Sequence, residues 1–403
     1  MTASAPRSPK YVMNLPYPKT FPTPAEEAFL NLVLCGDTDF PHAWKTWKEK
    51  NDFDDIEPGM LLLVPQLYLR MQKLAMQSDS LFGRIKGIYR SAWVKNQSII
   101  AGAKQFIAMC KTEHIPVILL KGIPIITEVY QDLGARFSGD ADVLVHPRHA
   151  GAIITMLGRN GWHSIDRAPG VPESAYHVFR TETFKAKGFL EIDVHWNPYE
   201  IDLGARFWDI ITLKPLPMFS FRETSWHDAI AMRLGEQDCL RPSNEDLLIH
   251  ILVHGSGMSP HRELRWVADA VAALGTLAID WNRLVARSRD YGTMVDTIVG
   301  LTYLRERFTD TIPDHVIDQL HASAPEPRDI RNYYRKMRKV KRYGWFGTVP
   351  LIWYAYWKFE PRKNGKKGFW GIVRYACKVW GLPSLSHLPR FIIGKYLLRV
   401  TSQ

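Results

Sequence analysis

The sequence has few cysteines and no long apolar segment. Its four cysteines are far apart in a chain of 403 residues and form no CxxC pair, so we expect neither a disulfide framework nor a cysteine-ligated zinc site. No uncharged run approaches the roughly 20 apolar residues that span a bilayer, which excludes a polytopic membrane protein. The first twenty residues contain Arg7, Lys10 and several prolines but no apolar segment typical of secretory signals. We therefore expect a cytoplasmic protein.

The composition is that of an ordinary globular protein. Hydrophobic residues make up 46% and charged residues 23% of the chain, which excludes a wholly disordered, collagen-like or coiled-coil protein. At about 150 residues per domain, the length predicts two or three domains.

Positive charge is concentrated near the C-terminus. Residues 331–403 contain 17 Lys and Arg residues and a single acid, Glu360, a net charge of +16, whereas the whole chain carries +11. The first 330 residues are therefore mildly acidic, with a net charge of −5. A strongly basic segment indicates an acidic partner such as nucleic acid, an anionic lipid or a polyanionic substrate. A solvated basic surface has the same composition, and this alternative stays open.

Local patterns divide the chain into five regions. Proline-rich sequence predicts an extended or disordered arm, helical periodicity predicts two helical regions, and short apolar runs between them predict an α/β core. The regions are the arm at 1–24, the N-terminal helical region at 25–111, the core at 112–235, a helical domain at 236–325 and a basic, aromatic extension at 326–403.

Short apolar runs predict the strands of the core. They cover 116–120, 141–145, 176–184 and 189–196. The last two are separated by residues 185–188, a turn that ends in glycine, and we expect them to form a hairpin.

Two of the predicted strands carry alternating carboxylates. Asp140 and Asp142 would lie on one face, about 7 Å apart at Cα, where two like charges are costly unless a cation lies between them. Oxygen ligands favour Mg²⁺ or Mn²⁺. On the other strand Glu191, Asp193 and His195 share a face, so Asp193 joins the pair if the strands are neighbours. Three carboxylates can hold two metal ions, which activate the attacking oxygen and stabilise the leaving oxygen of a phosphoryl transfer; the alternative is solubilising charge on an exposed face.

A set of motifs in a fixed order carries a family resemblance. The motifs are Leu120-Lys121-Gly122, Arg136 with Asp140-Ala141-Asp142-Val143-Leu144-Val145, Asp193-Val194-His195-Trp196, Asn244 to His250, and Leu264 to Asp269. In this order they resemble the uncharacterised nucleotidyltransferase family of the polymerase-β-like superfamily, over about residues 25–310. The resemblance implies an α+β fold with a nucleotidyltransferase-like mixed sheet core flanked by N-terminal and C-terminal helical regions.

The same resemblance implies a function. It would be a metal-dependent nucleotidyltransferase that moves a nucleoside monophosphate from an NTP to an unknown acceptor. Asp140, Asp142 and Asp193 would be the catalytic metal ligands, and Mg²⁺ or Mn²⁺ the cofactor.

Phosphate binding is where the chain departs from the superfamily. Better-known members have Gly-Ser at the start of the helix before the paired aspartates, where backbone N–H groups receive phosphate. This chain has Lys121-Gly122 there and Ser138-Gly139 directly before Asp140. Lys121 suits a phosphate but equally fits a solvent-facing lysine at a strand end, and His195 equally fits a packed structural role. The candidates for contact with the nucleotide and its phosphates are Lys121, Gly122, Arg136, Ser138, Gly139, His195 and Arg265.

The extension combines cations with aromatic rings. Residues 331–403 contain five Trp, seven Tyr and four Phe. This mixture suits an element lying on an anionic membrane surface, at the inner membrane face, and it suits equally a helical subdomain with an aromatic core. Single-stranded nucleic acid ranks behind both. Two further functions stay open: a protein that kept the fold and lost activity, and a membrane-associated factor in surface-polysaccharide synthesis.

Overall fold

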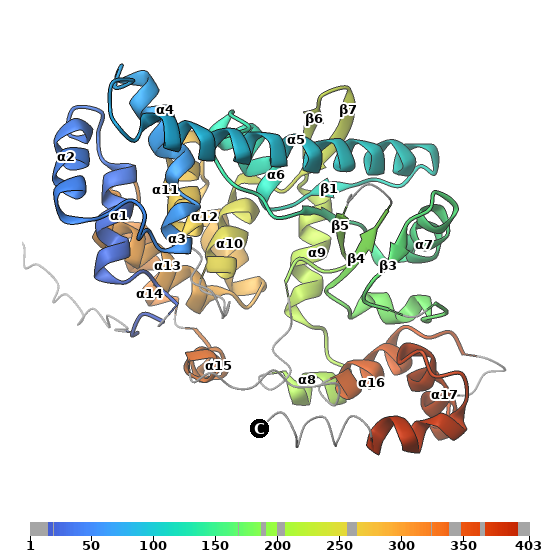
Figure 1. The fold of residues 1–403 in the computed structure, drawn as a ribbon. Helices are drawn as coiled ribbons and strands as arrows, with labels where there is room; N and C mark the ends of the chain where they lie inside the picture. Colours follow the sequence, from blue (N-terminus) through green and yellow to red (C-terminus); the bar gives the residue numbers. More distant parts are fainter. Residues whose placement is uncertain are drawn as a thin grey trace, which may run out of the picture. The chain divides into compact units, whose positions relative to one another are not determined.

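The computed structural model shows a chain of two compact units. It describes residues 15–18, 20–167, 169–186, 191–199, 206–255, 264–323, 325–337, 348–362 and 367–393. The first unit is built from 1–89 and 244–339, and the second from 90–243 and 340–403 (Figure 1). The fold is α+β, as predicted.

The described elements of the first unit are helices. At the start of α1, the Thr23 hydroxyl accepts a hydrogen bond from the Glu26 N–H, and the Glu26 carboxylate accepts one from the Thr23 N–H, so two free backbone donors are satisfied. The helices are α1 (Pro24–Leu34), α2 (Phe40–Lys50), α3 (Pro58–Leu61), α4 (Val64–Lys73), α10 (Asn244–Gly255), α11 (Arg265–Thr276), α12 (Trp281–Asp290), α13 (Met294–Arg307), α14 (Asp314–Ala322) and α15 (Pro327–Met337).

Part of the predicted disordered arm is packed. The Tyr17 ring lies 5.0 Å and the Phe21 ring 4.8 Å from the Tyr303 ring, centroid to centroid, and Phe21 is buried. Burial of these aromatic rings offsets the entropy of ordering the proline-rich segment. The structure therefore corrects the expected arm for its last residues, whereas residues 1–14 and 19 lie outside the described residues.

The second unit contains a seven-stranded mixed sheet in the order β3-β4-β5-β2-β1-β7-β6. Its strands are β1 (Ile118–Leu119), β2 (Ala141–Leu144), β3 (His163–Ser164), β4 (Thr181–Lys185), β5 (Glu191–His195), β6 (Ile230–Leu234) and β7 (Gln237–Arg241). Its helices are α5 (Phe82–Thr112, which begins in the first unit), α6 (Gly122–Pro124), η1 (Ile125–Tyr130), η2 (Pro147–His149), α7 (Ala150–Arg159), η3 (Glu173–His177), α8 (Phe207–Ile211), α9 (Pro217–His227), α16 (Thr348–Lys358), α17 (Phe369–Val379) and η6 (Leu385–His387). β2 and β5 run parallel, as do β1 and β7, and the other neighbours are antiparallel.

Alternation along β2 and β5 separates an apolar face from a polar one. Val143 and Val194 belong to the large buried cluster that includes Phe106 of α5 and Ile153 of α7. The residues between them point to the opposite face, because side chains alternate along a strand. Leu144 lies on that opposite face and packs in a second, smaller cluster.

Two local expectations differ from the structure. Residues 176–184 are not one strand: Tyr176 lies in η3, where its ring packs edge-on against Trp196 at 4.8 Å, and β4 begins only at Thr181. The expected boundary between 235 and 236 falls inside the hairpin in which β6 pairs with β7. Hydrogen bonding across that hairpin keeps both strands in the sheet, and the first segment of the second unit ends at Ser243.

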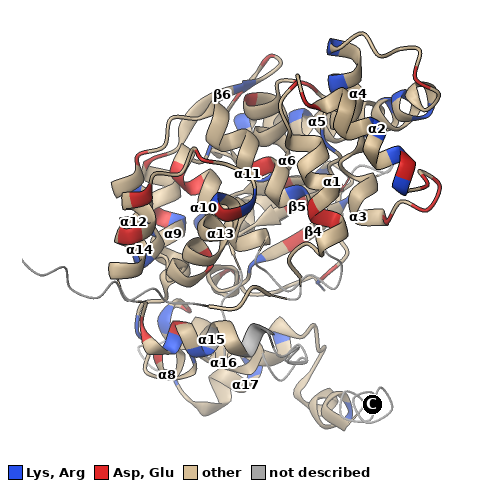
Figure 2. Ribbon diagram, turned by 90° about the vertical axis from the view of Figure 1, so that its left-hand side faces the viewer, with Lys and Arg blue, Asp and Glu red and all other residues tan. Residues whose placement is uncertain are grey.

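The described part of the basic extension is shared between the two units. α15 belongs to the first unit, whereas the aromatic side chains of α16 and α17 enter the core of the second. Tyr354, Tyr356 and Tyr375 are buried in the cluster that covers the sheet, and the Ser174 hydroxyl lies 2.9 Å from the Tyr375 hydroxyl. These contacts favour the expectation of an aromatic core for one side of the extension. α17 itself contains Arg374 and Lys378 and no acidic residue (Figure 2).

The length and hydropathy of the described helices decide whether one of them could cross a membrane. None of them combines the length and the apolar character needed to cross a bilayer.

Candidate metal centre

Strand register brings the predicted carboxylates together. β2 and β5 are parallel neighbours, and Asp142 pairs directly with Asp193. β4 lies on the other side of β5 and places Thr183 opposite Asp193. Asp142, Asp193 and Thr183 therefore form one row across three strands, on the face opposite to the large apolar cluster.

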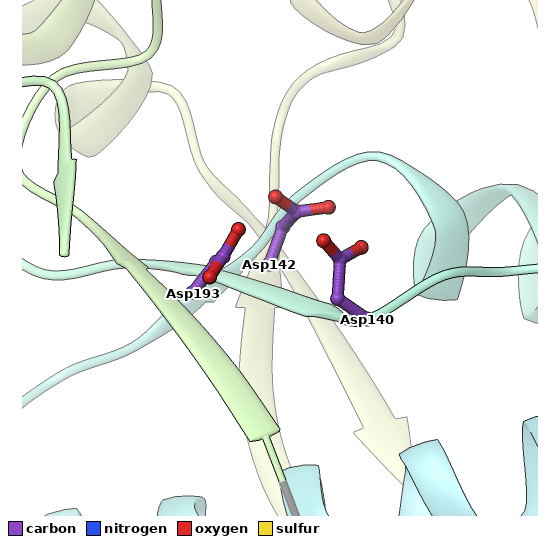
Figure 3. A group of neighbouring side chains, drawn as sticks. All are labelled: Asp140, Asp142 and Asp193. Atoms are coloured by element: carbon purple, nitrogen blue, oxygen red, sulfur yellow. The ribbon is translucent and has the colours of Figure 1, made fainter. Parts of the chain in front are cut away.

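The three aspartates converge on one point. Carboxylate oxygens of Asp140, Asp142 and Asp193 all lie within 4.8 Å of one another, and Figure 3 shows the three side chains rising from the same side of the strands. Asp142 is buried, with 3% of its surface exposed, and the other two are partly buried. The cluster thus contains one buried carboxylate, Asp142, and two carboxylates that solvent can partly reach, Asp140 and Asp193.

Two further predicted residues hold the buried carboxylate. Lys121 Nζ lies 2.5 Å from Asp142 Oδ1. The Nε2 atom of His195 lies 2.7 Å from the same oxygen, and the ring N–H donates while the carboxylate accepts. Lys121 lies two residues after the end of β1, whose pairing with β2 is extended by a hydrogen bond from the Leu120 N–H to the Asp142 carbonyl at 2.9 Å. The chain path therefore requires Lys121 to lie beside Asp142.

Burial and neighbouring charges separate the pKa values of the cluster. Burial raises the pKa of Asp140 to about 7, and the negative charge of Asp142 adds to the rise. Burial alone would raise the pKa of Asp142, but the Lys121 ammonium and the His195 hydrogen bond hold it well below its usual range. Burial raises the pKa of Asp193 despite the hydrogen bond from Thr183. Burial and the Lys121 charge lower the pKa of His195 to about 4, so this ring is neutral at pH 7.

The charge of the cluster fits a divalent cation. With all three carboxylates ionised, Lys121 is the one cation that contacts them in the described residues, which leaves an excess of two negative charges. Burial is the main cause of the raised pKa of Asp140, and the negative charge of Asp142 adds to it because a proton relieves part of that excess. Hard carboxylate oxygens are ligands that Mg²⁺ and Mn²⁺ prefer.

Comparisons with known proteins agree with this chemistry. Residues 61–309, more than half of the chain, match the family described as "Uncharacterised nucleotidyltransferase". The chain belongs to this family.

Similarity to individual proteins is weaker. The chain resembles the crystal structure of an antigenic nucleotidyltransferase-like protein from Paracoccidioides brasiliensis, with 13% identity, a TM-score of 0.34, and coverage of 52% of this chain and 93% of that chain. No curated protein matches the chain.

In this member of the uncharacterised nucleotidyltransferase family, three predicted phosphate ligands come together from two segments, the start of α6 and the loop before β2. A Cβ atom added to Gly122 would lie 2.3 Å from Ser138 Oγ and 3.3 Å from Arg136 Nη1. The preceding residue, Lys121, has a φ of +48°, a conformation that residues other than glycine rarely adopt. Gly122 and Ser138, which are far apart in the sequence, are thus adjacent in space.

The two other predicted nucleotide ligands lie in different surroundings. Gly139 is exposed, and a Cβ atom there would meet no described atom within 4 Å. Arg265 is the first residue of α11 and belongs to the first unit. The roles of both residues remain predictions.

Sequence reasoning missed two residues that support the site. The Thr183 hydroxyl donates to Asp193 Oδ1 at 2.6 Å. Asn96 of α5 donates to the carbonyl oxygens of Leu133 and Arg136 at 2.7 and 2.6 Å and accepts from the Ser138 N–H at 3.2 Å, so it braces the loop that leads to Asp140. Asn96 could have been found from the sequence as a polar residue at a buried position of a long amphipathic helix.

Replacing Thr183 with valine removes the hydroxyl while retaining the shape of the side chain. We expect the affinity for Mn²⁺ to fall by about 10–100-fold, the usual cost of losing a group that orients a metal ligand. Titration calorimetry of the Thr183→Val protein measures this effect. Thr181→Val, two residues away on the same strand, is the matched control. Equal affinities for Thr183→Val and the unchanged protein would show that Thr183 does not orient Asp193.

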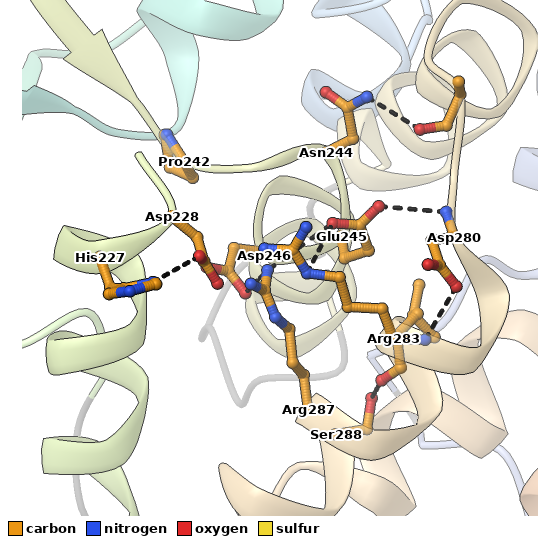
Figure 4. Close-up of polar contacts among 12 residues, drawn as sticks. His227, Asp228, Pro242, Asn244, Glu245, Asp246, Asp280, Arg283, Arg287 and Ser288 are labelled. Atoms are coloured by element: carbon orange, nitrogen blue, oxygen red, sulfur yellow. Dashed lines mark hydrogen bonds and ion pairs between the residues drawn. The ribbon is translucent and has the colours of Figure 1, made fainter. Parts of the chain in front are cut away.

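Other residues that carry the family resemblance have a structural role. At the start of α10, Asp246 is fully buried, and its Oδ1 accepts hydrogen bonds at 2.9 Å from Arg287 Nη1 and from the Tyr291 hydroxyl. Glu245 Oε2 lies 3.6 Å from the same Arg287 nitrogen, and Glu245 Oε1 accepts from the Asp280 N–H at 3.1 Å (Figure 4). This network joins α10 to α12 within the first unit.

Replacing Arg287 with methionine keeps most of its apolar bulk but leaves two buried carboxylates without this cation. We expect the free energy of unfolding to fall by about 3–5 kcal/mol, the range for breaking a buried ion pair from one side. Urea denaturation measures the loss. Arg289→Met, on the same helix, is the control. A decrease below about 1 kcal/mol would mean that Arg287 is not needed to balance the charge of Asp246.

Proposed function

We propose that this protein is a metal-dependent nucleotidyltransferase that moves a nucleoside monophosphate from an NTP to an acceptor. The observation that carries the proposal is the convergence of three carboxylates, from β2, its preceding loop and the parallel β5, within 4.8 Å. The excess negative charge of the cluster supports metal binding, and membership of the nucleotidyltransferase family supports an NTP as substrate.

Asp140, Asp142 and Asp193 would hold Mg²⁺ or Mn²⁺. When bound, such ions activate an attacking oxygen and stabilise a leaving oxygen in phosphoryl transfer. His195, neutral at pH 7 because its pKa is lowered to about 4, donates a hydrogen bond to Asp142 and fixes its orientation. Thr183 does the same for Asp193. These two contacts reduce the reorganisation that the carboxylates need when a cation arrives.

The triphosphate would be bound by cations and small residues beside the carboxylates. Lys121 and Arg136 would supply positive charge, and the absence of a side chain at Gly122 lets its backbone lie against the buried Ser138. In the reaction, an acceptor oxygen forms a bond to the α-phosphorus, the bond from that phosphorus to the bridging oxygen breaks, and pyrophosphate leaves. Where the attacking oxygen belongs to a hydroxyl group, its proton passes to water.

A direct test uses the full-length protein with Mg²⁺ or Mn²⁺ and each of the four NTPs labelled at the α-phosphate. Acceptors should include sugar phosphates, RNA ends and the protein itself. We expect one or more nucleotides to give pyrophosphate together with a labelled acceptor. Nucleotide binding without turnover for every combination would instead favour the binding protein that kept the fold and lost activity.

Metal affinity should rise with pH across neutrality. The pKa of Asp140 is raised to about 7, so below pH 7 a proton occupies the carboxylate that the metal needs, and above pH 7 that competition disappears. We expect the affinity for Mn²⁺ to increase by roughly tenfold between pH 6 and pH 8, measured by calorimetry in metal-free buffers. In the Asp140→Asn protein this rise should be absent. A flat profile in the unchanged protein would contradict the raised pKa.

Cellular location is part of the same proposal. A cytoplasmic protein has access to NTPs, and the charge of the extension supports contact with the anionic inner face of a membrane.

A further inference from the structure

The helix α17 has two dissimilar sides. Ile372, Ala376 and Val379 recur at spacings of four and three residues and pack against the buried core, which defines an inner side. Trp370, Arg374 and Lys378 recur every four residues and are exposed. Since successive residues of an α-helix are about 100° apart, this second set lies on the opposite side of the helix.

The outer side of α17 and the first residue of the helix expose large apolar side chains next to the cations. Phe369 is 72% and Trp370 66% exposed, and their rings touch edge-to-face at 5.5 Å. Beyond the C-terminal end of the helix, the Phe391 ring stacks on Trp380 at 5.6 Å and is followed by Ile392 and Ile393, with exposures of 38% and 58%. Exposed aromatic and aliphatic groups of this size, gathered in one segment, indicate a surface that a partner covers.

The charges around this apolar surface have one sign. Between residues 348 and 393 the sequence has Glu360 as its single acid, and that carboxylate is engaged at 2.5 Å by the Ser174 hydroxyl. Among the described residues of the same segment, the exposed cations are Lys358, Arg362, Arg374, Lys378 and Arg390. The partner must therefore be anionic and must also accept apolar groups.

We propose that the outer side of α17, formed by Trp370, Arg374 and Lys378, docks on an anionic lipid surface together with Phe369, the exposed first residue of the helix. Tryptophan and phenylalanine rings partition to the depth of the lipid headgroups, and Lys and Arg pair with anionic headgroups. Two exposed isoleucines favour lipid over single-stranded nucleic acid, because bases stack on aromatic rings and not on aliphatic side chains. A second copy of the chain is disfavoured, since two faces of the same positive charge repel each other.

This docking is independent of the proposed transferase reaction, because none of the residues involved belongs to the carboxylate cluster. The docking also explains why apolar side chains occur on the side of α17 that does not pack against the core.

Flotation of the full-length protein with vesicles, in the absence of nucleotide and metal, tests the proposal. One set of vesicles is pure phosphatidylcholine and the other contains about one third phosphatidylglycerol. We expect flotation with the anionic vesicles only, weakened by 0.5 M salt because surface charges are then screened. Phe369→Ser/Trp370→Ser and Arg374→Glu/Lys378→Glu should each reduce the bound fraction at least about tenfold. These side chains are exposed, and circular dichroism confirms that the variants fold.

Trp93→Ser is the matched control, because Trp93 is also an exposed tryptophan, at 43%, but lies on α5. It should float like the unchanged protein. Absence of flotation with anionic vesicles, or flotation that the two double variants do not reduce, would overturn the proposal. Two other results in the Phe369→Ser/Trp370→Ser protein would also overturn the proposal. One is a loss of single-stranded RNA binding with unchanged flotation, and the other is the loss of a concentration-dependent dimer with unchanged flotation.

Discussion

Replacing Asp142 with asparagine is expected to reduce nucleotidyl transfer by at least about 10³-fold. Asp142 is the most buried of the three carboxylates and the one that Lys121 and His195 both contact. The asparagine keeps the size of the side chain but removes the charge that holds a divalent ion. Metal ions stabilise the transition state of phosphoryl transfer by several kcal/mol, and each 1.36 kcal/mol corresponds to a factor of ten in rate.

The matched control is Glu191→Gln, on the same strand as Asp193. Glu191 is exposed and makes a surface ion pair with Lys185 at 2.8 Å, a contact that contributes little to stability. Its activity should stay within about twofold of the unchanged protein, measured as pyrophosphate release at saturating NTP. An Asp142→Asn protein that folds normally and retains a tenth of the activity would remove Asp142 from the catalytic ligands.

Replacing Lys121 with methionine should change metal binding and catalysis in opposite directions. In the absence of nucleotide, the Lys121 ammonium and a divalent ion compete for Asp142 Oδ1, which the ammonium approaches to 2.5 Å. Without the ammonium, we expect the affinity for Mn²⁺ to rise roughly tenfold, a small part of the Coulomb energy between charges a few ångströms apart. Transfer activity should fall by about 100-fold, because the triphosphate loses a cationic partner.

Calorimetric titration with Mn²⁺ and steady-state rates on the same protein separate the two effects. Lys185→Met removes a partly exposed lysine on β4 and should change neither quantity. If the affinity for Mn²⁺ falls together with activity in the Lys121→Met protein, the ammonium does not compete with the metal, and its role is to support the local structure.

Alternation along the strands made the carboxylate cluster predictable. The sequence Asp-Ala-Asp-Val-Leu-Val predicts a strand with two acids on one face, and Glu-Ile-Asp-Val-His predicts a second one. Val143 and Val194, which follow the two aspartates, are buried on one face of the sheet. Asp142 and Asp193 must therefore lie together on the opposite face. The pairing of the two strands could be expected only from the order of the family motifs, because α7, β3 and β4 separate β2 from β5 in the chain.

The contact of a supporting residue such as Thr183 depends on strand register, which the local sequence does not determine. Thr183 reaches Asp193 because β4 and β5 pair Lys185 with Glu191. A four-residue turn over 185–188 would place Thr183 opposite residue 190 instead, and residues 187 and 188 of that expected turn lie outside the described residues. A shift of this kind changes which side chains meet, so the Thr183 contact could not be derived from turn propensity.

The extension illustrates a second limit. Its composition fits a membrane-contacting element and an aromatic core equally well. The structure assigns these properties to different sides of the same segment, with Tyr375 buried in the core and Trp370 exposed. Composition does not distinguish the sides of a short helix when Trp, Tyr and cations occur at mixed spacing.

The most direct test of the account is a crystal of the full-length protein soaked with Mn²⁺ and a non-hydrolysable NTP. Anomalous scattering then locates the metal without assumptions about the ligand. We predict a Mn²⁺ peak bound by oxygens of Asp140, Asp142 and Asp193, in contact with the triphosphate. A nucleotide bound elsewhere, with no anomalous peak among these three carboxylates, would contradict the account.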